Sequence, residues 1–385
     1  MRAAVISTDA NDSAVAGKYL AAEVRKSLSN SPGALVVFAA PQYDHQAMLS
    51  AIKNELPDTI VVGASSAGEF TNVTSGPGLA CAMGLVGDDV VFSSSVGRNL
   101  KSDATAAAQE IASRFTSTAP AKFPFRAALV LADALAGHAD ILVDQLTIAT
   151  AGQYQFFGGG AGDNAQFQKT TVFCGAEVMS DAAVALEILS SKPLGVGVSH
   201  GWTPASRAYR VTASDGMKMI SLNGFPAIEV FEEHAEETHQ NFDRKEPLPF
   251  FLHNIIGVDT GAEHRLRVPL AVDGEGAVVC AAEVPMGSVV RIMRTSTDSA
   301  VSAAKQAANA ALHALGGPPA AALFFDCVAT RLRMGDEFGL ELSSLQERLS
   351  EVPLTGCNTH GQIARAEGQF SGFHNCTAVV CVFPE

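Results

Sequence analysis

A glycine-rich turn recurs three times along the chain, each time after an apolar run with strand character. The copies are Gly63-Ala-Ser-Ser-Ala-Gly68-Glu69, Gly158-Gly-Gly-Ala-Gly162-Asp163 and Gly356-Cys-Asn-Thr-His-Gly361-Gln362. An apolar stretch carrying a cysteine follows each copy at a similar distance, at Cys81, Cys174 and Cys376. A repeated supersecondary unit implies equivalent loops at equivalent places. The sequence therefore predicts a fold of repeated units.

The elements around the turns repeat as well. Runs rich in Val, Ile, Leu and Phe alternate with Ala-rich helical stretches, which is typical of an α/β protein with a buried sheet. We expect three βαβαββ units over residues 3–86, 90–178 and 289–383. Between the second and third units, residues 196–285 carry hairpin signals and predict a β-rich connector. The predicted fold is α/β, with mixed sheets flanked by helices.

Helices and domains follow from the same pattern. The six helices expected in the repeat units span residues 13–28, 45–56, 103–115, 138–150, 296–315 and 336–349, and an acidic helical run is expected within residues 228–244 of the connector. We place the domain division at residue 222/223. The first domain, 1–222, then holds two units and the start of the connector, and the second, 223–385, holds the rest.

Composition limits the classes of partner and compartment. The net charge is −14, and no Lys/Arg-rich run provides the clustered positive charge that nucleic acids or anionic membranes require. No run approaches the roughly 20 apolar residues of a membrane span, and the first residues do not resemble a signal peptide. Seven cysteines without a CxxC pair favour reduced thiols. We expect a cytoplasmic protein without membrane insertion and without nucleic-acid binding.

The motifs together resemble the FIST family of bacterial sensory proteins, over nearly the whole chain from about residue 33. The first half carries Ile60-Val-Val-Gly63 with its turn, the second turn, and Ser199-His-Gly-Trp202. The second half carries Phe324-Phe-Asp326-Cys327 with Arg331, the third turn, and Phe373-His374-Asn375-Cys376. The resemblance implies a FIST N-like domain followed by a FIST C-like domain.

The resemblance also implies a function, namely small-molecule sensing in signal transduction beside kinases and cyclic-di-GMP enzymes. Because no kinase, HAMP or GGDEF-like segment is attached, we expect the output to pass through a separate histidine kinase or cyclic-di-GMP enzyme. A homodimer is compatible with this interpretation. One branch of the family resembles the NosP haem-binding nitric-oxide sensors. The chain departs from the family pattern at His360-Gly361-Gln362, where an aromatic residue and Gly-Glu are usual, and at Cys376, where an amide is common.

The turns are the predicted ligand site, because glycine lets backbone N–H groups approach a ligand closely. They match neither a Walker A loop nor a Rossmann fingerprint. Tight packing turns are the competing interpretation. Asp326 and Arg331 would either grip a charged ligand or form a structural ion pair. The predicted ligand-binding residues are Ser65, Ser66, Gly68, Glu69, Gly160, Gly162, Asp163, Asp326, Arg331, Asn358, Gly361, Gln362 and Asn375.

The third turn raises two further alternatives. His360, His374 and Cys357 are candidate axial ligands if a haem binds, although no CxxCH attachment motif exists. A thiol enzyme would use Cys357 as nucleophile with His360 or His374 as base. Both alternatives stay open beside the small-molecule sensor, and the cofactor is otherwise unassigned.

Overall fold

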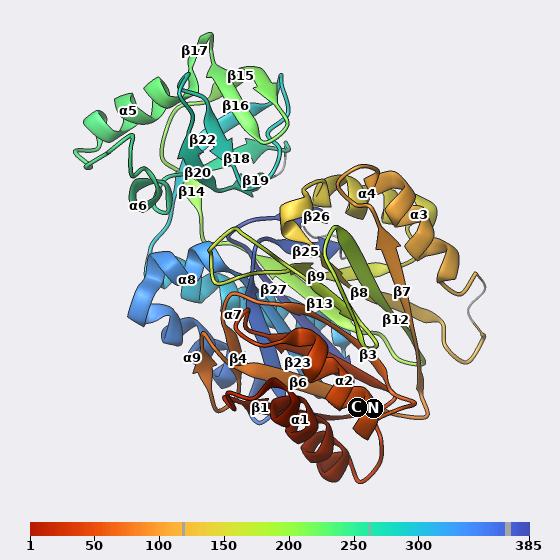
Figure 1. Ribbon diagram of the computed structural model, residues 1–385. Helices are drawn as coiled ribbons and strands as arrows, with labels where there is room; N and C mark the ends of the chain where they lie inside the picture. The colour runs from red at the N-terminus through yellow and green to blue at the C-terminus, as the bar shows by residue number, and fades with distance from the viewer. Residues whose placement is uncertain (118–119, 262, 366–370) are drawn as a thin grey trace.

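Three six-stranded sheets with the same internal strand order form most of the molecule (Figure 1). The computed structural model describes residues 1–117, 120–261, 263–365 and 371–385. Each sheet takes four strands from one unit, in the order first, last, second, third. Along the chain, the second and third strands of each unit run parallel to each other. The other neighbouring pairs of strands within a unit are antiparallel. The predicted α/β class with mixed sheets is confirmed.

Each unit supplies its four strands in the same spatial order. The first unit contributes β1 (Arg2–Thr8), β6 (Ala80–Val86), β2 (Ala34–Ala39) and β3 (Ile60–Ser65). The second contributes β7 (Val90–Arg98), β12 (Ala182–Ser190), β8 (Phe125–Ala132) and β9 (Gln155–Gly160). The third contributes β13 (Gly195–Ser199), β27 (Ala378–Pro384), β23 (Pro319–Cys327) and β24 (Leu354–Thr359).

The last two strands of each sheet are a hairpin from another unit. The hairpin β4 (Glu69–Thr71) and β5 (Ser75–Gly76) of the first unit joins the third sheet through β24. The hairpin β10 (Val172–Cys174) and β11 (Glu177–Met179) of the second joins the first sheet through β3. The hairpin β25 (Gln362–Arg365) and β26 (Ser371–His374) of the third joins the second sheet through β9. The exchange is cyclic, and each glycine-rich turn carries the chain from one sheet to the next.

Helices cover the outer face of each sheet. The first sheet is covered by α1 (Ser13–Leu28) and α2 (His45–Glu55), and the second by α3 (Ala104–Arg114) and α4 (Ala139–Ala149). The third is covered by α7 (Thr297–Leu315) and α9 (Phe338–Leu349), with α8 (Val328–Met334) beside them. Asp12, Asp44 and Asp103 accept backbone N–H bonds at the starts of α1, α2 and α3, which satisfies donors that no helical turn can satisfy. Short 3-10 turns lie at Ala134–Ala136 and Gly335–Glu337.

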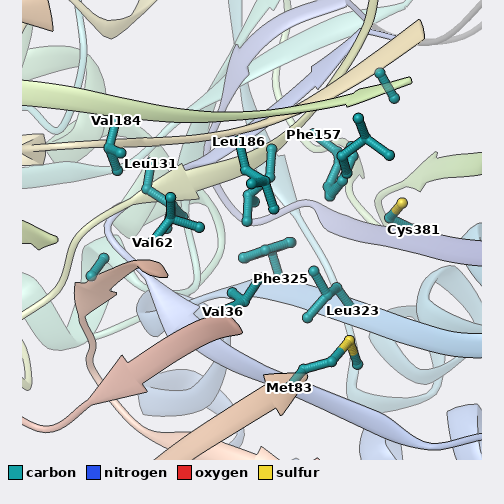
Figure 2. Close-up of a cluster of buried hydrophobic side chains, with 14 of the residues drawn as sticks. Val36, Val62, Met83, Leu131, Phe157, Val184, Leu186, Leu323, Phe325 and Cys381 are labelled. Carbon is teal, nitrogen blue, oxygen red and sulfur yellow. The ribbon is translucent and has the colours of Figure 1, made fainter. Parts of the chain in front are cut away.

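The inner faces of the three sheets share one core (Figure 2). Alternation along β2 points Val36 and Phe38 into it, while Leu35 and Val37 face the helices. Figure 2 shows side chains from all three sheets in contact around Phe325 of β23. Two-sided burial explains why the strands are almost continuously apolar.

A nine-stranded sheet is inserted between β13 and α7. It holds α5 (Ala227–Glu237), α6 (Leu248–Phe251) and the strands β14 (Thr203–Pro204), β15 (Tyr209–Asp215), β16 (Lys218–Leu222), β17 (Phe225–Pro226), β18 (Ile255–Asp259), β19 (His264–Arg267), β20 (Pro269–Val272), β21 (Val278–Cys280) and β22 (Val289–Arg294). Its first and last strands pair at Thr203 and Arg294, so the chain enters and leaves this β-rich insertion at one place (Figure 1).

Three strand-level expectations were wrong. The predicted first strand of the third unit, near residues 289–293, is β22 of the insertion, and β13 takes that position. The predicted last strand of the second unit, 171–178, is the exchanged hairpin, and β12 is the last strand. The three cysteines are therefore not equivalent, since Cys81 lies in β6, Cys174 in β10 and Cys376 just before β27. Apolar periodicity identifies a strand but not its partner.

The predicted division at 222/223 falls between β16 and β17, which pair at Leu222 and Phe225. As a domain boundary it stays a prediction. In the described part of the chain, none of the helices is long and apolar enough to cross a membrane.

Candidate functional site

The three glycine-rich turns lie against one another where β3, β9 and β24 end. Three backbone hydrogen bonds join them in a ring: Gly162 N–H to Ser65 O at 2.8 Å, Gly160 N–H to Gly361 O at 2.8 Å, and Ala67 N–H to Asn358 O at 2.9 Å. The turns therefore lie at corresponding positions around the shared core.

Close packing accounts for several of the small residues. A Cβ on Gly162 would lie 2.8 Å from Ala67 N, and one on Gly160 would lie 3.0 Å from His360 O. Both distances are too short for a side chain without movement of backbone. Ser65 is also engaged, because its hydroxyl accepts the N–H of Thr171 at 3.0 Å. At these positions the turns bind each other.

Asp163 organises the loop that follows the second turn. Its carboxylate accepts four backbone N–H bonds of 2.7–3.1 Å, from Gln166, Phe167, Gln168 and Lys169. Oδ1 also lies 3.5 Å from Nε2 of His360, on the third turn. The residue thus caps its own loop.

Gln362 has a similar role in the third turn. Its amide donates to Thr359 Oγ1 at 2.8 Å and accepts the N–H of Thr377 at 3.2 Å. The side chain fixes the segment that leads into β27.

Two cavities border the ring of turns, and the first is a polar cleft of about 510 Å³. Its polar wall consists of Glu69 from β4, Asn358 from β24 and Arg331 from α8, and Phe70, Pro77 and Phe338 form its apolar wall. This volume lies within the roughly 300–1,000 Å³ range of small-molecule sites. The predicted residues Glu69, Asn358 and Arg331 therefore come together, although they are far apart in sequence.

The polar wall has unsatisfied donors. Asn358 is 1 % exposed, and its Nδ2 has no hydrogen-bond partner among the described residues. The buried Nε of Arg331 has none either. Burial lowers the pKa of Arg331, and the nearby Glu69 opposes that shift. Buried donors without partners are uncommon in folded proteins.

Glu69 is the acid of the cleft. Its carboxylate accepts the Ser66 hydroxyl and, at 2.9 Å, the N–H of Leu79. Burial raises the pKa of Glu69 to about 7, against the opposing effects of these hydrogen bonds and of Arg331. This carboxyl group changes charge near neutral pH.

Gly68 leaves space for the side chains of Arg331 and Asn358 in the polar wall. It has a φ of +130°, and a Cβ there would lie 2.8 Å from Nη1 of Arg331 and 2.9 Å from Oδ1 of Asn358. Only glycine adopts this conformation readily while leaving both polar groups in place.

Asp326 and Arg331 do not form the expected pair, since no ion pair joins them among the described residues. Asp326 is buried, and burial together with Glu341 of α9 raises its pKa well above the usual range. Asp326 does not line the cleft around Arg331.

The second cavity is apolar and encloses about 190 Å³. It lies between the ring of turns and the insertion, and its polar groups come from His360, Asn375, Cys280 and Cys327. Asn375 is held by its side-chain oxygen, which accepts the N–H of Val268 at 3.4 Å. Other residues lining this cavity are Leu135, Phe167, Met217, Leu252, Val268, Val279, Ala329 and Leu332.

Comparison with known proteins places the chain in a family. The sequence matches the FIST N domain over residues 33–224 and the FIST C domain over residues 227–365. The chain belongs to the FIST family. Two uncharacterized proteins from two strains of Mycobacterium tuberculosis are each 24% identical over 260 residues, covering 66% of this chain and 67% of theirs.

Among solved structures, the crystal structure of a cyanuric acid hydrolase from A. caulinodans aligns with 100% of this chain and 99% of its own. The TM-score is 0.37 and the identity 8%. A likeness of that size supports no conclusion about this FIST protein.

The candidate haem and thiol residues are dispersed in the FIST fold. Cys357 points into the shared core, and burial raises its pKa well above the usual range. His374 is buried, and burial, Arg267 and Arg265 lower its pKa. His360 lines the apolar cavity and stacks on Phe167 with ring centroids 4.8 Å apart. Burial lowers the pKa of His360 to about 4.

These positions fit a haem poorly. Of the three candidate ligands only His360 lines either of the two cavities beside the turns, and that cavity, about 190 Å³, is smaller than ordinary drug-sized pockets of roughly 300 Å³ or more. No group of three His, Cys, Asp or Glu side chains placed to hold a metal ion occurs within residues 1–117, 120–261, 263–365 and 371–385.

Sequence reasoning overlooked Cys327 as a site residue. It is the last residue of β23, whose carboxyl end lies beside that of its parallel neighbour β24. Ligand sites in α/β sheets favour this edge. Its position at the end of an apolar run was the available signal.

Proposed function

We propose that this FIST protein is a cytoplasmic sensor that binds a small carboxylate-bearing molecule in the polar cleft of Glu69, Asn358 and Arg331. The supporting observation is the pair of buried, unpartnered donors on one wall, Asn358 Nδ2 and Arg331 Nε. A carboxylate can accept from a guanidinium and an amide at once, and charge-assisted hydrogen bonds are the stronger ones. Such a ligand would satisfy donors that are otherwise buried at a cost.

Glu69 gives the cleft a second recognition element. A ligand with an amino or amide N–H beside its carboxylate would place that donor toward Glu69, whose pKa of about 7 allows ionisation when a cation approaches. Amino acids and their close derivatives have this arrangement. The apolar wall of Phe70, Pro77 and Phe338 would contact the side chain of the ligand.

The position of the cleft suits signalling. Glu69 lies within the FIST N match and Arg331 within the FIST C match, so a bound ligand would bridge the two. A ligand that binds one arrangement of hairpin β4–β5 and helix α8 better than another shifts the population toward it. The output partner in this proposal is a separate histidine kinase or cyclic-di-GMP enzyme.

A thermal-shift screen of amino acids and small carboxylic acids tests the proposal. We expect one chemical group of compounds to raise the melting temperature of the wild-type protein, since a ligand at about 100 times its dissociation constant adds about 2.7 kcal/mol of stability. Arg331→Lys, which loses the planar fork, and Asn358→Asp, which replaces a donor by an acceptor, should abolish the shift.

Arg114→Met is the matched control, because Arg114 is an exposed arginine on α3, outside the polar cleft. It should keep the full ligand-induced shift. Equal shifts in the wild type, Arg331→Lys and Asn358→Asp would mean that the ligand binds elsewhere.

A further inference from the structure

We propose that Cys327 and Cys376 form a peroxide-reactive dithiol at the apolar cavity, which a small organic hydroperoxide oxidises to a disulfide. This site is separate from the polar cleft and does not depend on a ligand there. The two residues are 3 % and 5 % exposed, and both are free thiols.

The fold brings the two cysteines to the same place. Cys327 is the last residue of β23, and Cys376 lies two residues before β27. These strands are antiparallel neighbours that pair up to Phe325 and Val379, so their adjoining ends lie side by side, and both cysteines belong to one cluster of buried side chains. Residues on neighbouring strands lie about as far apart as the Cα separation of about 4.4–6.8 Å that disulfides require.

The surroundings make Cys327 the attacking thiol. Hydrogen bonding from Cys376, the largest effect, together with that from the backbone of Cys376 and Ala329 and from the Gln362 amide, lowers the pKa of Cys327 to about 7 against the opposing effect of burial. A lower pKa favours the thiolate. Burial and the neighbouring Cys327 raise the pKa of Cys376. One thiol is therefore poised as nucleophile and the other as the thiol that resolves the intermediate.

The backbone at Cys376 supports a special role. Its φ is +49°, in the left-handed region that non-glycine residues seldom occupy. Gln362 accepts the N–H of the next residue, Thr377, at 3.2 Å and donates to Thr359 Oγ1 at 2.8 Å. Thr359 pairs with Cys327 across β23 and β24, so Gln362 ties the segment of Cys376 to the strand end that carries Cys327.

The cavity selects the class of oxidant. Cys327 lines it, and so do four large apolar residues that are 37–43 % exposed: Leu135, Phe167, Met217 and Leu332. These form an apolar opening to solvent. A dry cavity of about 150 Å³ holds a benzene-sized molecule, so about 190 Å³ suits a small hydrocarbon group. An alkyl hydroperoxide carries such a group beside its reactive O–O bond.

The chemistry balances in two steps. The Cys327 thiolate attacks the terminal oxygen of the hydroperoxide, the O–O bond breaks, and the alkoxide takes a proton from water to leave as an alcohol. The Cys376 thiol then attacks the resulting sulfenic acid, forming the disulfide and releasing water. In sum, two thiols and one hydroperoxide give a disulfide, an alcohol and water.

Peptide mass spectrometry of the wild-type protein treated with tert-butyl hydroperoxide is the primary test. We expect a cross-linked peptide joining Cys327 to Cys376 and the loss of two thiols per chain. In the Cys376→Ser variant, dimedone should trap a sulfenic acid on Cys327, and the Cys327→Ser variant should give no adduct at Cys376. The wild-type measurement needs no variant to fold.

Cys174→Ser is the control, since Cys174 is the one partly exposed cysteine of the seven and lies in hairpin β10–β11. It should form the same cross-link. At pH 7 Cys327 should react about tenfold faster than a free cysteine, because its thiolate fraction is larger. Oxidation of Cys174 with Cys327 and Cys376 left reduced would overturn the proposal.

A separate comparison of reaction rates tests the assignment to organic hydroperoxides. For tert-butyl hydroperoxide and for hydrogen peroxide, the rate of reaction with the protein is divided by the rate of reaction of the same oxidant with free cysteine. We expect the ratio for the organic hydroperoxide to be the larger one. A larger ratio for hydrogen peroxide would overturn the assignment to organic hydroperoxides.

Discussion

Gly162 lies where the second turn contacts the first, and the nearest atom to it there belongs to the backbone. A methyl group at this position would sit 2.8 Å from Ala67 N and 3.1 Å from Ser66 C. We expect Gly162→Ala to lower the free energy of unfolding by about 2 kcal/mol, the usual cost of overpacking. Urea denaturation followed by circular dichroism measures it. Gly274→Ala is the control, because a Cβ on Gly274 meets no atom within 4 Å. Equal stabilities of the two variants would contradict close packing of the turns.

Glu69 should make stability depend on pH. Its pKa rises from 4.5 to about 7 on folding, so the folded state binds more protons between these values. Stability therefore falls as pH rises through this window. Glu69→Gln removes the charge, while the amide oxygen can still accept the N–H of Leu79 and the amide N–H can donate to the Ser66 hydroxyl. We expect the variant to be more stable than the wild type above pH 7, by at most about 3 kcal/mol, and to lose the advantage below pH 4.5.

Thermal unfolding at pH 5 and pH 8 measures this difference. Glu347→Gln, which changes an exposed carboxylate on α9, is the control. A Glu69→Gln variant with the same pH profile as the wild type would show that Glu69 is not a buried acid.

The candidate site was predictable from sequence only in part. Motifs identified Glu69, Asn358 and Arg331, because glycine-rich turns and charged residues after apolar strands are local features. The same reasoning chose Cys357 as the reactive thiol, whereas Cys357 faces the core and Cys327 lines a cavity. Which face of a buried strand meets a cavity depends on other sheets. Two residues at which the chain departs from the family pattern, Gln362 and Cys376, are among the groups that lower the pKa of Cys327.

Among the elements, helices were predicted well and strand partners were not. Predicted helix bounds agree with α1, α2, α3, α4 and α7 within one residue at each end, since caps and apolar periodicity are local signals. The cyclic exchange of hairpins joins strands hundreds of residues apart, such as Thr71 and Thr355. No local pattern specifies such a pairing.

The insertion should be separable from the three-sheet body. Thr295 Oγ1 donates to Gly201 O at 2.7 Å, so the ends of the insertion lie together, and the shared core contains none of its residues. We expect replacement of residues 203–294 by a short Gly-Ser linker to leave a cooperatively melting protein. The variant should lose its selectivity for organic hydroperoxides, because the insertion supplies one wall of the apolar cavity. Failure to fold would mean that the insertion stabilises the body.

At the scale of the molecule, each unit supplies a hairpin to the sheet of another unit. A break in residues 191–194 separates the first two units from the third. The first fragment keeps hairpin β4–β5 without its sheet, and the second keeps β25–β26 without its sheet. We expect the coexpressed fragments to associate and to copurify through a tag on one of them, while each alone shows no cooperative melt. A cooperatively melting first fragment would show that the exchange is dispensable.

The cyclic exchange also sets a delay during biosynthesis. Hairpin β4–β5 leaves the ribosome early, but β24, its partner strand, begins at Leu354. At ordinary elongation rates the interval is roughly 15 to 60 s. The nascent chain exposes an unpaired strand edge for that time, and such edges promote aggregation. Until β24 has emerged, this architecture therefore leaves the growing polypeptide open to aggregation.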